Sequence, residues 1–273
     1  MPIDLPASAD RRQVAPPGIA THWADVFELD FFAPDASFGG FVTMGLYPGA
    51  KRGWFWAAVV GDDRQLVLVV DDELPLPAAP HLEVRSSGIW TDFIPQIPLE
   101  HFTVGLEAFG VGLDDPNDVF DGLRGDLTPI GFDMEWETEG DMWPIDPTGF
   151  EVPCRAHGEI LLGHEEFDFD GLGTRRRWWG PDDRRAAPGM RLSGWWHDGA
   201  SFGAACELLD RASPEVFVVE ATDIATSPLT LVVKAVAPLP IIRPGHDEVG
   251  QRWRMLCRVE AGDKVGVAWL DLQ

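Results

Sequence analysis

The sequence predicts an all-β protein made of antiparallel strands arranged as barrels or sandwiches. Short segments rich in Val, Phe, Trp and Thr recur between clusters of Gly, Pro and Asp, the usual pattern of strands and turns. The 29 Gly and 23 Pro leave few windows for a long helix, and the best of them, residues 202–211, is short and ambiguous. Hydrophobic residues form 45% of the chain and charged residues 24%, a composition that supports a sizeable core.

The candidate strands follow one another along most of the chain. In order they are "FVTMGLY" (41–47), "GWFWAAVV" (53–60), "QLVLVV" (65–70), "HFTVGLEAF" (101–109), "FEVPCRAHGEILL" (150–162), "EVFVVEA" (215–221), "LTLVVKAV" (229–236) and "KVGVAWL" (264–270). Gly, Pro or Asp residues lie between them, which favours hairpin connections over helical crossovers.

One further strand, residues 130–140, shows strict alternation. Ile130, Phe132, Met134 and Trp136 alternate with Gly131, Asp133, Glu135 and Glu137. Successive side chains of a strand point to opposite faces, so this strand has one apolar face and one row of carboxylates. The simpler interpretation is core on one side and water on the other. In a barrel, the polar face could instead point into a ligand cavity.

Irregular stretches suggest how the chain is divided. Residues 114–126 are rich in Asp and form a candidate long loop, and a second irregular patch spans residues 140–149. We place a division there, which gives an N-terminal β domain at 23–145 and a C-terminal β domain at 146–273. Residues 1–22 are expected to form a loosely ordered arm, because Pro and polar residues offer little surface to bury.

Charge excludes several classes of partner. The formal net charge is −24 and the pI about 4.4, so binding to nucleic acid or to an anionic membrane surface is unfavourable. No apolar run approaches the ~20 residues of a membrane helix, and the N-terminus has no apolar stretch of the secretory type. We therefore expect a cytoplasmic protein. The segment "DGLGTRRRWWGPDD" (170–183) stands out because three arginines precede two tryptophans.

Metal and cofactor signatures are missing from the sequence. Cys154, Cys206 and Cys257 form no paired motif, so buried free thiols are the expectation. The seven histidines are scattered, and the "HEEFD" segment at His164 lacks the second histidine of a zinc helix. No G-x-S-x-G, Walker lysine or complete dinucleotide fingerprint occurs. We expect neither a metal nor a cofactor.

Carboxylates and histidines set among aromatic residues are the remaining candidates for chemistry. We predict acid–base roles for four residues and a cavity lined by three tryptophans: Asp92, His101, Glu107 and His157, with Trp54, Trp90 and Trp136. A carboxyl group in an apolar pocket has a raised pKa and can donate a proton, and aromatic faces stabilise developing positive charge. On one straight strand His101 and Glu107 would share a face about 20 Å apart at ~3.3 Å per residue, too far for a direct pair.

The stretch "FEVPCRAHGEILLGHEEFDFDGLGTRRRWWGPDD" (150–183) resembles the second half of the AttH-like proteins. These are two-domain, lipocalin-like proteins in the superfamily that contains hydroxyneurosporene synthase, a carotenoid hydratase. The family pattern of a Cys-x-x-x-Gly strand followed by Asp-Gly-x-Gly is matched by Cys154, Gly158, Asp170, Gly171 and Gly173. The segments "WTDFIPQIPLEHFTVGLEAFGVGLDDP", "PIGFDMEWE" and "RWRMLCRVEAGDKVGVAWLDLQ" are also similar, so the resemblance covers most of residues 25–273. It implies two lipocalin-like antiparallel β-barrel or sandwich domains packed together.

The family's "RDHSWG" box is altered in this chain. Arg175 matches its first arginine and Trp179 its tryptophan, whereas Arg176, Arg177 and Trp178 stand in place of Asp, His and Ser. If the Asp–His pair is catalytic in relatives, that chemistry is missing here; if the box is a structural staple between domains, the change matters less. On a strand, Arg175 and Arg177 face one way and Arg176 the other. Four nearby acids are expected as their partners: Asp168, Asp170, Asp182 and Asp183.

The resemblance implies a cofactor-independent acid–base enzyme of the hydratase, isomerase or cyclase type. Its substrate would be a hydrophobic terpenoid- or polyketide-like molecule held in an aromatic-lined cavity, with Arg175 and Trp179 added to the three tryptophans as ligand-binding residues. The alternative is a carrier protein that holds a hydrophobic ligand without converting it, and a purely structural protein is a third reading.

Overall fold

The computed structural model describes residues 5–16, 18, 23–146, 148–181, 189–222, 224, 228–241 and 250–272. Nearly all regular structure in these ranges is antiparallel β-strand, which confirms the all-β prediction. Three short 3₁₀ helices are the exceptions: η1 (Ala7–Asp10), η3 (Pro48–Ala50) and η4 (Pro116–Asp121).

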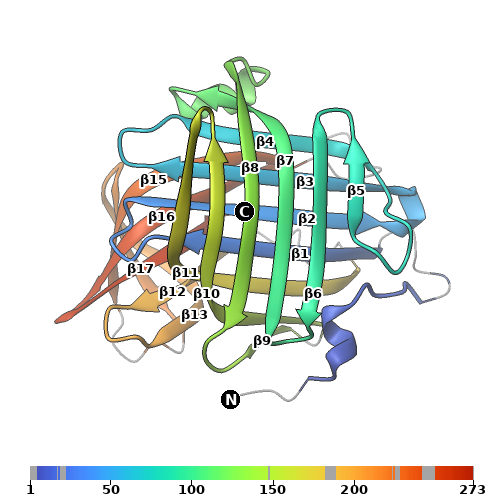
Figure 1. The fold of residues 1–273 in the computed structure, drawn as a ribbon. Helices are drawn as coiled ribbons and strands as arrows, with labels where there is room; N and C mark the ends of the chain where they lie inside the picture. Colours follow the sequence, from blue (N-terminus) through green and yellow to red (C-terminus); the bar gives the residue numbers. More distant parts are fainter. Residues whose placement is uncertain are drawn as a thin grey trace.

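The first sheet contains eleven strands. They are β1 (Trp23–Phe32), β2 (Phe38–Tyr47), β3 (Arg52–Gly61), β4 (Leu66–Pro75), β5 (Glu83–Ser86), β6 (Ile89–Ile97), β7 (His101–Leu113), β8 (Asp126–Thr138), β9 (Trp143–Asp146), β10 (Gly149–Leu162) and β11 (Glu165–Pro181). The order is β4-β3-β2-β1-β11-β10-β8-β7-β6-β5, with β9 beside β10. Because β4 also pairs with β7, eight strands form a closed circuit, which we call the first barrel. In Figure 1, β6, β7, β8 and β10 run side by side, and β1–β4 cross behind them.

The second sheet is a closed barrel of six strands. It consists of β12 (Met190–Trp196), β13 (Ser201–Ser213), β14 (Val216–Ala221), β15 (Leu229–Ile241), β16 (Gly250–Ala261) and β17 (Lys264–Leu272). Residues 202–211, the most helix-like window of the sequence, lie within the strand β13. The chain passes from the first sheet to the second between Pro181 and Met190. The predicted division at 145/146 does not coincide with this passage, because β10 and β11 pair with β8 and β1.

Large aromatic side chains fill the interior of the first barrel. Strand β8 contributes Phe132 and Trp136 to this core, while Glu135 and Glu137 lie on the outer face. The simpler reading of the alternating strand is therefore correct. Trp136 is fully buried, and its Nε1 donates to the Asp30 carbonyl at 2.8 Å.

Two further apolar clusters complete the packing. One fills the second barrel, and the other lies between the barrels and contains Trp54 and Trp56 of β3 together with residues of β15, β16 and β17. Each fully buried large side chain contributes roughly 1.5–3 kcal/mol. The contact between the barrels is thus a core in its own right.

The N-terminal arm is anchored to the barrel at Ala9 and Asp10, which are buried, whereas its other described residues are exposed or half-buried. Asp10 is fully buried, accepts a hydrogen bond from the Leu99 amide at 2.6 Å and forms an ion pair with Arg175. The Gln13 amide donates to Asp25 at 2.9 Å. Composition could not predict these contacts, because the arm is attached to the barrel mainly through one buried carboxylate, that of Asp10.

Candidate functional site in the pocket between the two barrels

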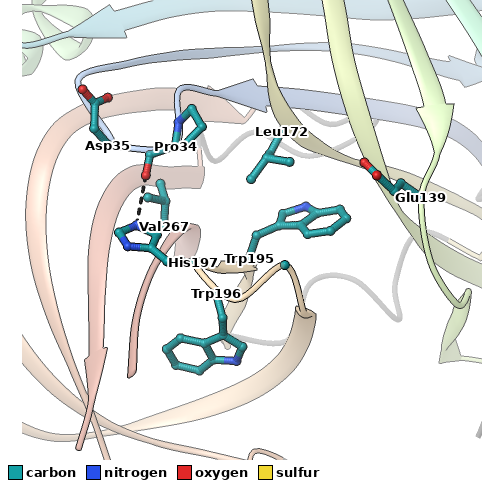
Figure 2. Close-up of a pocket in the computed structure, with 9 residues that line it drawn as sticks. Pro34, Asp35, Glu139, Leu172, Trp195, Trp196, His197 and Val267 are labelled. Carbon is teal, nitrogen blue, oxygen red and sulfur yellow. Dashed lines mark hydrogen bonds between the residues drawn. The ribbon is translucent and has the colours of Figure 1, made fainter. Parts of the chain in front are cut away.

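A cavity of about 470 Å³ opens where the two barrels meet. This volume lies within the range of small-molecule sites. We call it the inter-barrel pocket, and Figure 2 shows the side chains around it. Its lining comes from the β1–β2 turn, the end of β8, β11, β12, the β12–β13 turn and β17: Pro34, Asp35, Glu139, Leu172, Trp195, Trp196, His197, Gly199 and Val267.

Two tryptophans at the end of β12 form the aromatic wall. Trp195 is 4% exposed, and its Nε1 donates to the Gly173 carbonyl of β11 at 3.1 Å, which fixes the ring against the first barrel. Trp196 packs on Phe202 with ring centroids 4.5 Å apart. Both rings are therefore held by contacts outside the pocket, so the wall is formed before any ligand binds.

His197 directly follows Trp196 in the sequence, so a titratable side chain lies next to the aromatic wall. Its Nε2 lies 3.1 Å from the Pro34 carbonyl oxygen (Figure 2). A carbonyl oxygen only accepts hydrogen bonds, so Nε2 carries the proton in this arrangement. In the tautomer with its proton on Nε2, Nδ1 has a free lone pair that can accept a proton, which is the requirement for a general base.

Two carboxylates flank the pocket on opposite sides in Figure 2, Asp35 and Glu139. Ser37 donates to Asp35 Oδ1 from its hydroxyl at 2.6 Å and from its amide at 3.0 Å, which lowers the pKa of Asp35. Asp35 is therefore an anion at neutral pH. Negative charge at this mouth favours a substrate on which positive charge develops.

A buried cluster of charged side chains joins the barrels, and we call it the ion cluster. Arg176 lies 3.0 Å from Glu151 and 3.1 Å from both Glu28 and Asp271. Burial alone would raise the pKa of Glu28, but Arg252 and Arg176 hold it at about 2. The other members are Arg191, Arg252, Arg254 and Asp30.

Asp30 differs from its neighbours in the ion cluster. Burial raises its pKa to about 6, although Arg254 at 2.9 Å and two hydrogen bonds from Thr174 act in the opposite direction. Another acid of the cluster, Asp271, has a lowered pKa because Arg252, Arg254 and Arg176 outweigh its burial. The cluster therefore holds one carboxyl group that titrates far above its ordinary range.

The three arginines at 175–177 alternate between the two barrels, as the strand geometry predicts. Arg175 and Arg177 point into the first barrel, where they lie over the rings of Phe102 and Phe27, and Arg176 points to the ion cluster. Among the described residues, their carboxylate partners differ from the predicted ones. Arg175 pairs with Asp10 and Arg177 with Asp25, whereas Asp170 pairs with Arg155. Asp182 and Asp183 lie outside the described residues.

The four predicted acid–base residues lie on the outer face of the first barrel. His101 is hydrogen-bonded to Glu135 at 2.7 Å, and His157 is 3.5 Å from Glu137. Asp92 is half-buried, and burial together with the neighbouring Glu83 raises its pKa. Glu107 is exposed on the same face. None of the four lines the inter-barrel pocket, and their catalytic roles stay predictions.

The predicted ligand-binding residues are spread over four environments. Trp136 and Arg175 lie inside the first barrel, and Trp54 stacks on Trp56 between the barrels with centroids 4.2 Å apart. Trp90 lies on the outer face, and Trp179 packs beside Arg177. The structure does not bring them together around one cavity among the described residues.

Sequence reasoning missed the residues that do line the inter-barrel pocket. The sequence feature that could have indicated this pocket is the segment "SGWWHDG" (193–199), in which two tryptophans and a histidine precede a turn. The three cysteines were placed correctly. All are free and buried, and burial raises the pKa of Cys154 to about 12 and that of Cys206 to about 11. Such thiols are poor nucleophiles.

Comparison with known proteins identifies the family. The model of a domain of unknown function, DUF7064, matches residues 7–208. The chain belongs to this family. No curated protein matches the sequence. The described residues contain no group of three or more His, Cys, Asp or Glu side chains arranged to hold a metal ion, and no helix among them is long and apolar enough to cross a membrane.

Solved structures show the fold that this member of the DUF7064 family shares. CghA, in a crystal structure with Sch210972, superposes with a TM-score of 0.54 at 10% identity, over 96% of this chain and 93% of CghA. An AttH-type protein from Nitrosomonas europaea gives 0.52 at 10% identity, over 96% and 97%. A second CghA structure gives 0.52 at 10% identity, over 96% and 93%. The chain therefore has the two-barrel, lipocalin-like fold of the AttH-type proteins, as the sequence resemblance implies.

Proposed function

We propose that this protein is a cofactor-independent acid–base enzyme that converts a hydrophobic small molecule in the inter-barrel pocket. The observation that carries the proposal is the position of His197 at the end of an aromatic wall, with its Nε2 engaged by the Pro34 carbonyl. Nδ1 would take or return a proton, and Trp195 and Trp196 would stabilise positive charge on the substrate. CghA, a protein with this fold, has been solved with the compound Sch210972, which supports a ligand-binding role.

The reaction class that fits these groups is hydration, dehydration, isomerisation or cyclisation of a terpenoid- or polyketide-like molecule. Each of these reactions moves a proton and needs no redox partner or group carrier. A histidine as proton acceptor and donor, two fixed indole rings and the flanking carboxylate of Asp35 supply what such a step requires.

The alternative is a carrier that binds the same molecule and leaves it unchanged. One observation favours it: Arg176 and Arg177, which occupy the Asp and His positions of the family box, are buried in ion pairs. A guanidinium group cannot exchange protons at physiological pH. If proton transfer in relatives depends on that box, this chain has kept the binding site alone.

Mass spectrometry of the ligand that co-purifies with the protein would identify the test molecule, and Nile red would serve as the binding probe. Leu172→Trp replaces an aliphatic side chain of the pocket with a bulky indole ring, and we expect about tenfold weaker Nile red binding. Ile97→Trp, at an exposed position of β6, is the matched control. Unchanged binding in Leu172→Trp, with a Tm equal to the wild type, would refute the site.

The substitution His197→Asn distinguishes an enzyme from a carrier protein. The enzyme proposal predicts at least a 100-fold loss of turnover of the identified ligand with Nile red affinity within about twofold. A wild-type protein that returns the ligand unaltered after prolonged incubation would instead establish the carrier.

A further inference from the structure

A second cavity, of about 480 Å³, lies on the outer face of the first barrel and shares no residue with the inter-barrel pocket. We call it the outer groove. It crosses β6, β7, β8 and β10, the strands that run side by side in Figure 1. Its lining includes Arg85, Trp90, Glu107, Phe109, Gly131 and Leu161.

The outer groove exists because one strand has no side chain at its centre. Gly131 of β8 lies in register between Glu107 of β7 and Leu161 of β10. A Cβ atom at Gly131 would lie only 3.3 Å from the Cβ of Leu161. Because glycine has no such atom, the backbone of Gly131 forms the bottom of the groove between the side chains of Glu107 and Leu161. Phe109 is 56% exposed and Leu161 is 39% exposed. Such clustered apolar exposure on a strand face indicates a binding surface.

The aromatic wall of the outer groove is fixed in place. Trp90 lies opposite Glu107 in the β6–β7 ladder, and its ring rests on the sheet at Gly105, where a Cβ atom would come within 2.9 Å of it. The Trp90 Nε1 donates to Glu83 at 3.2 Å. The indole is therefore held from two sides, and its orientation does not depend on a ligand.

The charge of the outer groove is negative and uncompensated. Its one cation, Arg85, donates to Glu83 from Nε at 3.0 Å and from Nη2 at 2.9 Å. Glu107 has no ion-pair or hydrogen-bond partner among the residues that the structure describes. Asp133 and Glu159 lie exposed on the same face, and the whole chain carries a net charge of −24. An anionic ligand would be repelled here, whereas a cation would be attracted.

We propose that the outer groove binds a small hydrophobic molecule that carries an ammonium group. The apolar part would lie on Phe109, Leu161 and the floor at Gly131, and the ammonium group would lie between the Trp90 ring and the Glu107 carboxylate. An aromatic face beside a carboxylate is the usual recognition element for organic ammonium ions. The volume suits one ligand of drug-like size. This inference is independent of the function proposed for the inter-barrel pocket.

Binding of 4-phenylbutylamine and its neutral analogue 4-phenyl-1-butanol tests the proposal by isothermal titration calorimetry on the full chain. We expect the ammonium ion to bind at least about tenfold more tightly than the alcohol, with affinity that falls as salt is added. Glu107→Gln should weaken amine binding about fivefold and leave alcohol binding unchanged. Glu159→Gln removes a carboxylate of the same face outside the groove and is the matched control.

The indole ¹⁵N–¹H resonance of Trp90, assigned with Trp90→Phe, locates the ligand. A shift of this resonance on amine addition supports the site. Equal affinity for amine and alcohol, or equal amine affinity in Glu107→Gln and the wild type, would overturn the proposal. So would light scattering that shows a dimer broken by Phe109→Ser with no amine binding, because the groove would then be an interface between copies of the chain.

Discussion

Replacing Arg176 by methionine should destabilise the protein severely, because this guanidinium joins the two barrels at the centre of the ion cluster. It is 7% exposed and contacts Glu28 of β1, Glu151 of β10 and Asp271 of β17. Methionine has a similar length and packs well in apolar surroundings. The substitution therefore removes charge and hydrogen bonds with little loss of volume.

The magnitude follows from the charge balance of the ion cluster. The wild-type cluster holds four carboxyl groups, on Glu28, Asp30, Glu151 and Asp271, and four guanidinium groups, on Arg176, Arg191, Arg252 and Arg254. Without Arg176, four carboxyl groups face three guanidinium groups in a buried space. One uncompensated buried charge costs about 3–5 kcal/mol, out of a total stability of about 5–15 kcal/mol.

Urea titration followed by Trp fluorescence, together with thermal unfolding, measures this loss. The expected fall in Tm is roughly 6–20 °C. Arg155→Met is the matched control, because Arg155 pairs with Asp170 at 2.7 Å on the exposed face of the same strand pair, where such pairs contribute about 0–1 kcal/mol. Adding Glu151→Gln to Arg176→Met should recover part of the stability by restoring the balance of charge. If Arg176→Met lost no more stability than Arg155→Met, the ion cluster would not hold the barrels together.

Two further predictions concern buried carboxyl groups. The pKa of Asp30 rises from 3.8 in the unfolded chain to about 6 in the folded protein. Between these pH values the folded state binds a proton that the unfolded state does not bind. The stability that this proton provides is therefore present below pH 3.8 and is lost as pH rises through 6. Between pH 4 and 7 the stability of Asp30→Asn should therefore improve relative to the wild type by about 3 kcal/mol; a difference that does not vary with pH in urea titrations would contradict the raised pKa. Asp10→Asn leaves Arg175 without its carboxylate and should cost about 3–5 kcal/mol and speed proteolysis of the N-terminal arm. Asp35→Asn, on an exposed turn, serves as its control, and an arm equally resistant to protease in both variants would refute the prediction.

Local pattern predicted many of the strands, but it missed β1 and left residues 202–211 of β13 ambiguous, and it did not predict which strands pair. The alternation in residues 130–137 defines both faces of β8, because one strand with one buried face leaves little choice of orientation. The passage between sheets could not be read in the same way. β11 pairs with β1 along Trp23–Phe32, a contact between segments about 150 residues apart in the sequence. Loop composition at 140–149 marks only the connection that contains the short strand β9.

The same limit explains why the predicted acid–base residues lie outside the inter-barrel pocket. Spacing along β7 places His101 and Glu107 on one face, but it does not say whether that face lines a cavity or meets solvent. The glycines of the family pattern were more informative about the fold. A Cβ atom at Gly173 would lie 2.1 Å from the Asp30 carbonyl oxygen. At Gly158, where φ is +142°, it would lie 2.1 Å from the Asp133 carbonyl oxygen. Close packing of backbones, not chemistry, requires glycine at both positions.

The three arginines at 175–177 have different structural roles, because successive side chains of a strand point to opposite faces. Arg175 and Arg177 hold the N-terminal arm and the base of β1 through Asp10 and Asp25, whereas Arg176 faces the second barrel. A guanidinium group stays protonated at every pH that the fold survives, so this position of β11 supplies fixed charge and cannot transfer protons. If the inter-barrel pocket carries the reaction that we propose, the proton must be moved by another residue, and the histidine that lines this pocket is His197. In the function that we propose, the candidate chemistry therefore lies in the turn after β12, and β11 supplies charge that joins the two barrels.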